Sequence, residues 1–271
     1  MLENAVSISS PDKVVFENEQ ITKGDIADYY RQIAERMLPY IRNRNLSLVQ
    51  CPQGTKAPCF YKKNKSEGVI LDPIKTPDDL LAHVQNNTLE FHTWGSCADN
   101  PDRPDMMTFD LDPDEGMELA KVRRGVKDLK DILDELKLKS FLKTSGNKGY
   151  HIVVPIKAAV SWDAVGKFAK DVALVMEKKF PNLYTENVRK ANRKGKIFID
   201  WIRNGRGATS VAPYSIRAKN ARVSAPISWQ ELDTIAPNQI TMQESLRRSK
   251  KTDPWKDFFD VQKTQWLKIS L

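Results

Sequence analysis

Three aspartates of this sequence stand where they could hold divalent metal ions. Asp110 and Asp112 are separated by one apolar residue in the segment Met106–Asp112, and a β-strand would turn both carboxylates to the same face. Asp200 stands in a second apolar segment, Ile197–Ile202, where an unpaired charge is costly. If the two strands are neighbours, the carboxylates can bind two divalent ions about 3.5–4 Å apart. Because carboxylate oxygens suit Mg²⁺ or Mn²⁺, we expect these aspartates to be metal ligands and catalytic residues.

The same aspartates also have an ordinary structural interpretation. A D-x-D pair is common, and Asp200 could instead form an ion pair with Arg203 or Arg206. A calcium-binding loop that starts at Asp110 is excluded, because Glu115 and Lys121 stand where such a loop needs glycine and glutamate.

The segment Ser145–His151, of sequence SGNKGYH, could bind phosphate groups. Its two glycines let the backbone approach a ligand closely, and the Lys148 ammonium can contact a triphosphate. Ser145 and His151 can donate hydrogen bonds to phosphate oxygens. The segment is not a P-loop, which needs G-x-x-x-x-G-K-[ST], and a plain hairpin turn is the alternative.

Two further side chains are candidates for the same site. His92 alternates with apolar residues in the segment Leu89–Trp94, and Arg217 follows a loop rich in glycine and arginine at residues 203–207. A structural histidine and a basic surface loop are the corresponding alternatives.

Composition limits the class of protein. The chain has 271 residues, of which 40% are hydrophobic and 29% are charged, as in ordinary globular proteins. It has no apolar run near the roughly 18 residues of a membrane span and no secretory signal, so we expect a cytoplasmic protein without membrane contact. The net charge of +8 favours a polyanionic partner such as nucleic acid. We expect Cys51, Cys59 and Cys97 to be reduced and to form neither a zinc site nor a disulfide.

The elements that must position these groups can be predicted from periodicity and capping residues. We predict helices over residues 23–40, from Thr76 to about 86, over 117–136 and over 161–179. We predict strands over 46–51, 58–62, 89–94, 106–112, 140–144, 150–156 and 197–202. The region after Trp229 should be helical or irregular, with a solvated basic face at Arg247–Lys251.

This mixture of hairpins and long helices predicts an α+β fold in a single domain over residues 1–271. We expect a curved, largely antiparallel sheet that carries the carboxylates on one face and helices on its back. The predicted parts are an N-terminal lobe of about residues 1–100, a catalytic lobe of about 101–230, and a C-terminal helical or irregular segment of about 231–271.

The order of these motifs resembles the archaeo-eukaryotic primase superfamily. His92 comes first, followed by Asp110-Leu111-Asp112, the SGNKGYH segment, Asp200 and Arg217. Within the superfamily, the chain is most similar to the polymerase domain of bacterial and archaeal DNA ligase D, the repair polymerase of non-homologous end joining. The resemblance covers about residues 10–222.

The resemblance implies a role for each matching residue. It implies that the three aspartates bind the metals, and that His92, Ser145, Lys148, His151 and Arg217 bind the incoming nucleoside triphosphate. Ser10, Lys13 and Lys23 would bind the 5′-phosphate at the far side of a gap, although Ser10 replaces the asparagine of the family. Phe60 and Tyr61 would stack on a template base.

The implied activity is template-directed nucleotide addition at gaps and 3′ ends of broken, nucleoid-associated DNA, with NTPs or dNTPs as substrates. The family also implies a preference for ribonucleotides and for manganese. If the chain acts alone, a ligase and a DNA-end-binding protein would be separate partners. The alternatives are a true primase, a metal-dependent phosphodiesterase and a non-catalytic module that bridges DNA ends.

Overall fold

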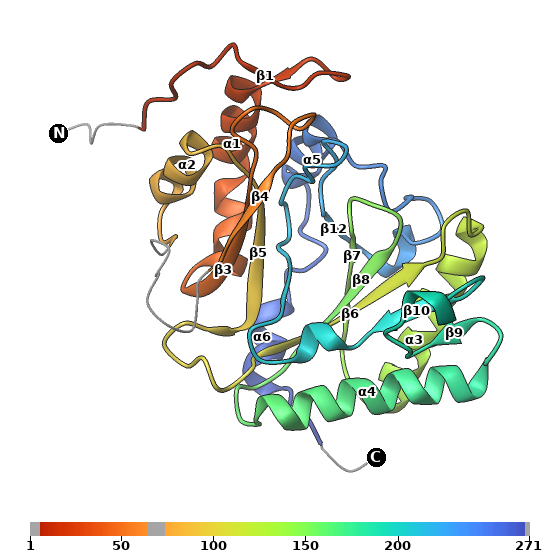
Figure 1. Cartoon of the computed structure of the whole chain (residues 1–271). Helices are drawn as coiled ribbons and strands as arrows, with labels where there is room; N and C mark the ends of the chain where they lie inside the picture. Colours follow the sequence, from red (N-terminus) through yellow and green to blue (C-terminus); the bar gives the residue numbers. More distant parts are fainter. Residues whose placement is uncertain (1–5, 64–73, 269–271) are drawn as a thin grey trace.

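The computed structural model describes residues 6–63 and 74–268 and contains two main sheets with helices packed against them (Figure 1). The smaller main sheet has the strand order β11-β5-β3-β4. Its strands are β3 (Arg44–Gln50), β4 (Phe60–Lys63), β5 (Thr88–Cys97) and β11 (Thr209–Val211). All neighbours in this sheet are antiparallel.

Two helices cover this sheet, and each begins with a capping box. The helices are α1 (Lys23–Ile41) and α2 (Pro77–Gln85). The Thr22 and Thr76 side chains accept hydrogen bonds from backbone amides of the first turn, and an aspartate three residues later bonds back to each cap. Tyr30 of α1 packs edge-on against Phe91 of β5 at a ring distance of 5.2 Å. This contact fixes α1 on the sheet that carries His92.

The larger sheet has six strands in the order β12-β7-β8-β6-β10-β9. Its strands are β6 (Met106–Pro113), β7 (Phe141–Thr144), β8 (Tyr150–Pro155), β9 (Tyr184–Thr185), β10 (Ile197–Asp200) and β12 (Pro226–Ile227). Only the β9–β10 pair of this sheet is parallel. A separate two-stranded sheet joins β1 (Val14–Phe16) to β2 (Ile21–Thr22).

Helices α3 (Leu119–Glu135) and α4 (Trp162–Lys179) pack on the six-stranded sheet (Figure 1). Gly125 of α3 lies so close to Leu111 and Ile197 that a β-carbon there would stand 3.1–3.3 Å from their methyl groups. Since neighbouring strand residues point to opposite faces, the side chains next to Leu111 must point away from these helices.

The C-terminal segment joins the two sheets through aromatic packing. It contains α5 (Met242–Ser249) and α6 (Phe258–Thr264). The rings of Trp255 and Phe258 stack at 5.1 Å, and both contact Tyr40 of α1 and Phe141 of β7. This cluster links α1 to strand β7 of the six-stranded sheet.

The predicted α+β fold is confirmed, and so are the predicted helices and strands, with ends that differ by a few residues. The strand predicted over residues 197–202 stops at Asp200, where a short 3₁₀ helix, Ile202–Asn204, begins. The short strands β1, β2, β9, β11 and β12 were not predicted, because two or three residues carry no readable periodicity.

The expectation of three reduced cysteines is wrong, because Cys51 and Cys59 form a disulfide. Gln50 pairs with Phe60 across β3 and β4, so Cys51 and Cys59 are the next facing positions, with Cα atoms 4.4 Å apart. Facing positions of antiparallel strands lie at a separation that a disulfide can span. Cys97 is the free cysteine.

Within residues 6–63 and 74–268, none of the helices has the length and apolar character that crossing a membrane would need.

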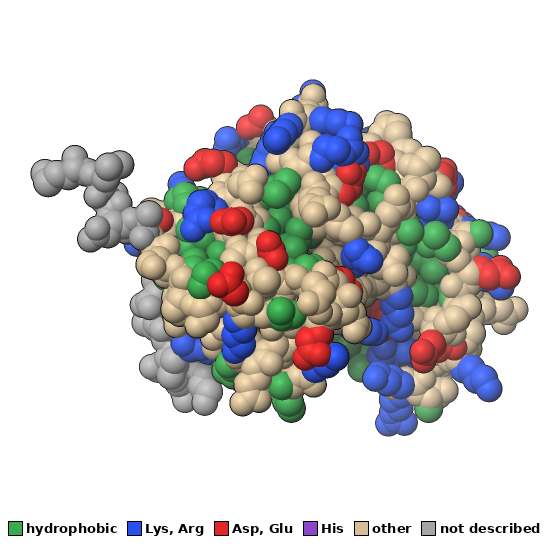
Figure 2. Space-filling view, turned by 90° about the horizontal axis from the view of Figure 1, so that it is seen from above, with side chains coloured by type: hydrophobic (Ala, Val, Ile, Leu, Met, Phe, Trp, Pro, Cys, Tyr) green, Lys and Arg blue, Asp and Glu red, His purple; other side chains and the backbone are tan. Residues whose placement is uncertain are grey.

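Seen from above, the surface carries lysine and arginine side chains in a band right of its centre, with acidic side chains scattered around it (Figure 2).

Candidate active site

Asp110 and Asp200 face each other across two neighbouring strands. Strands β6 and β10 are antiparallel, with Asp200 opposite Asp110 and Ile199 opposite Leu111. Leu111 is fully buried, whereas the side chains of Asp110 and Asp200 keep 14% and 16% of their exposure. Asp112 lies two residues farther along the same face and is 39% exposed. The two acidic strands are therefore neighbours, which is the condition on which the predicted metal site depends.

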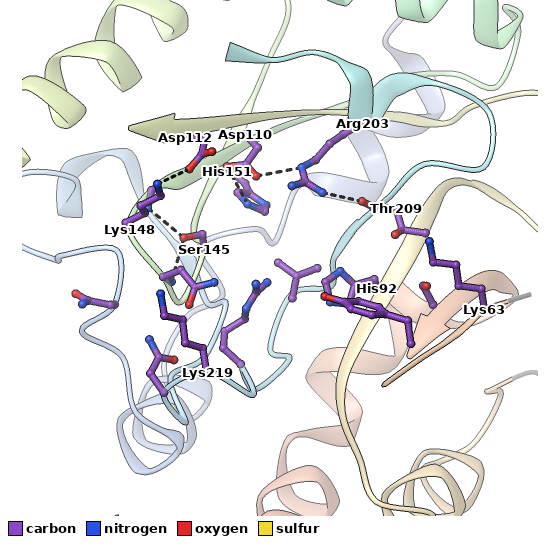
Figure 3. A pocket seen from close by; sticks show the side chains of 18 residues that line it. Lys63, His92, Asp110, Asp112, Ser145, Lys148, His151, Arg203, Thr209 and Lys219 are labelled. Carbon is purple, nitrogen blue, oxygen red and sulfur yellow. Dashed lines mark hydrogen bonds and ion pairs between the residues drawn. The ribbon is translucent and has the colours of Figure 1, made fainter. Parts of the chain in front are cut away.

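Arg203 bridges the facing carboxylates. Its Nε atom lies 3.0 Å from Asp110 Oδ2, and its Nη1 atom donates to the Thr209 carbonyl at 3.1 Å (Figure 3). The same Nε atom lies 3.2 Å from Asp200 Oδ2. The structural alternative for Asp200, an ion pair with Arg203, is therefore also realised. Arg206 pairs instead with Asp102 at 2.8 Å.

The pKa values of the two facing carboxylates are shifted in opposite directions. Burial and the neighbouring Asp110 raise the pKa of Asp200 above its usual value, although Arg203 acts against them. Burial alone would also raise the pKa of Asp110, but His151 and Arg203 hold it far below its usual value. Two carboxylates this close need a cation between them, and Arg203 provides one.

The donor set fits hard divalent cations, which prefer carboxylate oxygens. As the side chains stand in the described part of the chain, no three His, Cys, Asp or Glu residues form a ready metal site. The carboxylates are paired with cations of the chain instead: Arg203 contacts Asp110 and Asp200, while Lys148 Nζ lies 3.2 Å from Asp112 Oδ1. A divalent ion would have to displace these side chains.

The turn that follows β7, residues 145–149, is in direct contact with β6, the strand that carries Asp110 and Asp112. Ser145 Oγ accepts hydrogen bonds from the backbone amides of Asn147 and Gly149, which organises the turn internally. A β-carbon at Gly149 would lie 2.1 Å from the Leu111 carbonyl oxygen, so only glycine fits there. Gly146 has a φ of 73°, in the left-handed region. This close fit places Lys148 over Asp112 (Figure 3).

His151 is a buried neighbour of Asp110. Its Nε2 atom lies 3.4 Å from Asp110 Oδ1, and its Nδ1 atom lies 3.0 Å from Nζ of the buried Lys143, which also donates to Ser224. Burial and the Lys143 charge lower the pKa of His151 to about 4. The imidazole is therefore neutral at pH 7.

Asp110, Asp112, Lys148 and His151 line a cavity of about 510 Å³ between the two sheets, whereas Asp200 is not among its lining residues. Its other wall carries Tyr61, His92 and Arg217 (Figure 3 labels His92). His92 Nε2 lies 2.8 Å from Glu90 Oε2, and Arg217 Nε lies 3.5 Å from the same oxygen. Eight of the predicted residues line this one cavity: Tyr61, His92, Asp110, Asp112, Ser145, Lys148, His151 and Arg217.

The residues predicted to bind a 5′-phosphate lie away from this cavity. Lys13 and Lys23 are neighbours, because Lys23 N donates to the Lys13 carbonyl at 2.8 Å, and Ser10 closes the adjoining turn. Both ammonium groups donate to backbone carbonyls, Lys13 to Pro52 and Lys23 to Gln85. Burial, followed by the charge of Lys13, lowers the pKa of Lys23.

The predicted aromatic pair is split by the geometry of β4. Adjacent strand residues point to opposite faces, so Tyr61 lines the cavity and approaches His92 at 6.5 Å while Phe60 does not line it. Both rings are exposed, at 49% for Phe60 and 65% for Tyr61.

Three side chains of the site were missed or undervalued in the sequence. Arg203 was considered only as a surface partner for Asp200, and Glu90 and Lys143 were not considered. Glu90 could have been found by its spacing, since it precedes His92 by two residues and shares its face in a strand. Lys143 gives no such signal.

Comparison with known proteins agrees with this geometry. Residues 22–255 match the family described as "LigD, primase-polymerase domain". The chain is 34% identical over 274 residues to the multifunctional non-homologous end joining protein LigD of Pseudomonas aeruginosa, covering 93% of this chain and 33% of that protein. The bifunctional LigD of Bacillus subtilis is 28% identical over 273 residues, covering 94% and 44%. The chain thus spans between a third and a half of these relatives.

A solved structure has the same fold. The polymerase domain of Mycobacterium tuberculosis ligase D, in complex with DNA, superposes with a TM-score of 0.85 at 30% identity and covers 96% of this chain and 99% of that one. Together with the matched range and the acidic strands around one cavity, this confirms the resemblance seen in the sequence: the chain belongs to the LigD primase–polymerase domain family.

Proposed function

We propose that this chain is a template-directed nucleotidyltransferase that fills gaps and extends 3′ ends at DNA breaks during non-homologous end joining. The observation that carries the proposal is the facing pair of Asp110 and Asp200, which adjoins a cavity lined by Lys148, His151 and Arg217. Acidic and basic groups around one cavity suit a reaction between a metal-bound hydroxyl and a triphosphate.

The proposed metal ligands are Asp110, Asp112 and Asp200, with Mg²⁺ or Mn²⁺ as the ions. When bound, the ions would supply charge neutralisation for the reacting hydroxyl and the leaving pyrophosphate. Arg203 has to release Asp110 and Asp200 before such ions can bind. The freed guanidinium stays at the cavity, where it can pair with a phosphate.

The proposed triphosphate contacts come from both walls of the cavity. Lys148 is 55% exposed and flexible enough to move from Asp112 to a phosphate oxygen. Arg217 lines the cavity with its Nε atom 3.5 Å from Glu90 Oε2, and its guanidinium can form a charge-assisted contact with a phosphate. His151 has its Nδ1 atom 3.0 Å from Lys143 Nζ, so its Nε2 atom, 3.4 Å from Asp110 Oδ1, is the ring nitrogen that can turn to a phosphate oxygen.

The proposed nucleic-acid partner is DNA with a gap or broken end that carries a 5′-phosphate. Lys13 and Lys23 are neighbouring cations, and the exposed ring of Tyr61 lines the cavity that Asp110 and Asp112 also line. We further propose a ligase and a DNA-end-binding protein as partners, a preference for ribonucleotides, and a location at the nucleoid, since the relatives are end-joining proteins.

Primer extension on a gapped duplex tests the proposal. The substrate is offered with and without the 5′-phosphate, in Mg²⁺ and in Mn²⁺, and with NTPs and dNTPs separately. We expect wild-type protein to add templated nucleotides and Asp110→Asn to lose this addition, because the change removes a charge that the metals need. Asp102→Asn is the matched control, since Asp102 pairs with Arg206 at the surface. Retained extension in Asp110→Asn would contradict the metal assignment.

A further inference from the structure

One buried carboxylate next to the cavity, Glu90, has no part in the proposed function. Glu90 lies on β5 two residues before His92, so both side chains point to the same face. Its side chain is only 7% exposed, and it is not among the residues that line the cavity. A carboxylate at this depth is costly unless several donors satisfy it.

Three donors from two separate segments satisfy Glu90. Its Oε2 atom accepts a hydrogen bond from His92 Nε2 at 2.8 Å and lies 3.5 Å from Arg217 Nε. Its Oε1 atom accepts from the backbone amide of Ala218 at 2.7 Å. One side chain therefore ties strand β5 to the loop that carries Arg217.

These contacts determine what His92 and Arg217 can offer to a ligand. An ionised carboxylate only accepts hydrogen bonds, so the His92 proton must be on Nε2, and Nδ1 is left as an acceptor. Arg217 turns its Nε toward Glu90 and keeps its terminal nitrogens for other partners. With its amide oriented to satisfy both of its polar atoms, Asn147 accepts from Arg217 Nη2 at 2.8 Å. Arg217 is thereby aimed at the turn that carries Lys148.

We propose that Glu90 is a positioning residue of the nucleotide site, which holds His92 in one tautomer and Arg217 in one orientation before the triphosphate arrives. The inference rests on the proposed function. Glu90 contacts neither the cavity nor the three aspartates in the described structure. Its effect therefore falls on nucleotide affinity rather than on the chemical step.

The substitution Glu90→Gln tests this inference, because glutamine keeps an acceptor for Ala218 and removes the charge. We expect the KM for ATP to rise about 10-fold to 100-fold, the range for a lost charge-assisted hydrogen bond, while kcat stays within about 3-fold. Calorimetric titration with ATP should show the same loss of affinity. Glu118→Gln, on an exposed carboxylate beside Lys121, is the matched control and should change neither quantity.

Two further readouts separate positioning from a general structural effect. In an Arg217→Ala background, Glu90→Gln should cost less ATP affinity than in the wild type, since one of the two side chains that Glu90 positions is gone. The chain has three histidines, so nitrogen NMR can resolve the His92 ring. The ring proton should be fixed on Nε2 in the wild type and should no longer be fixed there in Glu90→Gln.

The outcomes are distinct. Unchanged KM, ATP affinity and His92 tautomer in Glu90→Gln, with a wild type that extends primers, would overturn this inference alone. A lower melting temperature with reduced kcat and an unchanged KM would overturn it too, as a purely structural effect. A wild type that neither binds ATP nor extends primers would refute the proposed function and the inference with it.

Discussion

Replacing Gly149 by alanine should damage the site through the backbone alone. The added β-carbon would lie 2.1 Å from the Leu111 carbonyl oxygen, whereas ordinary contacts begin at 3.4 Å. The turn and strand β6 must therefore separate by the difference, about 1.3 Å, if the contact is to relax fully. Leu111 stands between Asp110 and Asp112, so the movement reaches both carboxylates.

The size of the effect follows from the size of the clash. Overpacking of this kind costs about 1–3 kcal/mol of the free energy of unfolding. A displacement of about 1 Å in reacting groups reduces a rate about 100-fold. We therefore expect Gly149→Ala to unfold at lower urea and to extend primers about 100-fold more slowly than wild type.

Urea denaturation and single-nucleotide extension measure the two quantities, and Gly166→Ala is the matched control. Gly166 lies inside α4, where a β-carbon would meet the Asn204 carbonyl oxygen at an ordinary 3.5 Å. That change should stabilise the protein by up to about 1 kcal/mol, because alanine is the better helix former. If Gly149→Ala matched wild type in both assays, the close fit between the turn and the acidic strand would be disproved.

Three further predictions concern charged side chains. Asp105→Asn should lower the free energy of unfolding by about 3–5 kcal/mol, because it leaves the guanidinium of Arg44 buried without its carboxylate. Urea denaturation measures this loss, and a loss under about 1 kcal/mol would contradict the prediction. Arg203→Gln should bind Mn²⁺ about 10-fold more tightly than wild type, since one competing cation is gone, and electron paramagnetic resonance measures this affinity. Arg206→Gln is the control and should bind Mn²⁺ as wild type does. Equal affinities in the two variants would show that Arg203 does not compete with the metal. Lys23→Gln should remove most of the preference for a 5′-phosphorylated gap in the extension assay, and an unchanged preference would place that pocket elsewhere.

The aspartates could be predicted because their signal is local. Alternation around Leu111 assigns Asp110 and Asp112 to one face, and an acid in an apolar strand marks Asp200 as unusual. Their meeting could not be derived from the sequence, because it depends on the antiparallel register of β6 and β10. That register is set by packing of Leu111 and Ile199 against the core.

Contacts between distant segments set the limit of the sequence prediction. The bond between Cys51 and Cys59 depends on the pairing of β3 with β4, which cysteine counting does not show. The role of Glu90 depends on a loop that returns more than a hundred residues later, at Ala218. In the sequence alone, such an acid looks like an ordinary surface charge.

The charges of the cavity explain why metal and nucleotide binding should support each other. In the structure each carboxylate is neutralised by a cation of the chain: Arg203 serves Asp110 and Asp200, and Lys148 serves Asp112. A divalent ion that takes over these carboxylates releases two cations beside the cavity, and a triphosphate needs such cations. A triphosphate that attracts Lys148 and Arg203 exposes the carboxylates in turn. Because each ligand removes the competitor of the other, thermodynamic linkage requires that the gain in affinity be the same in both directions.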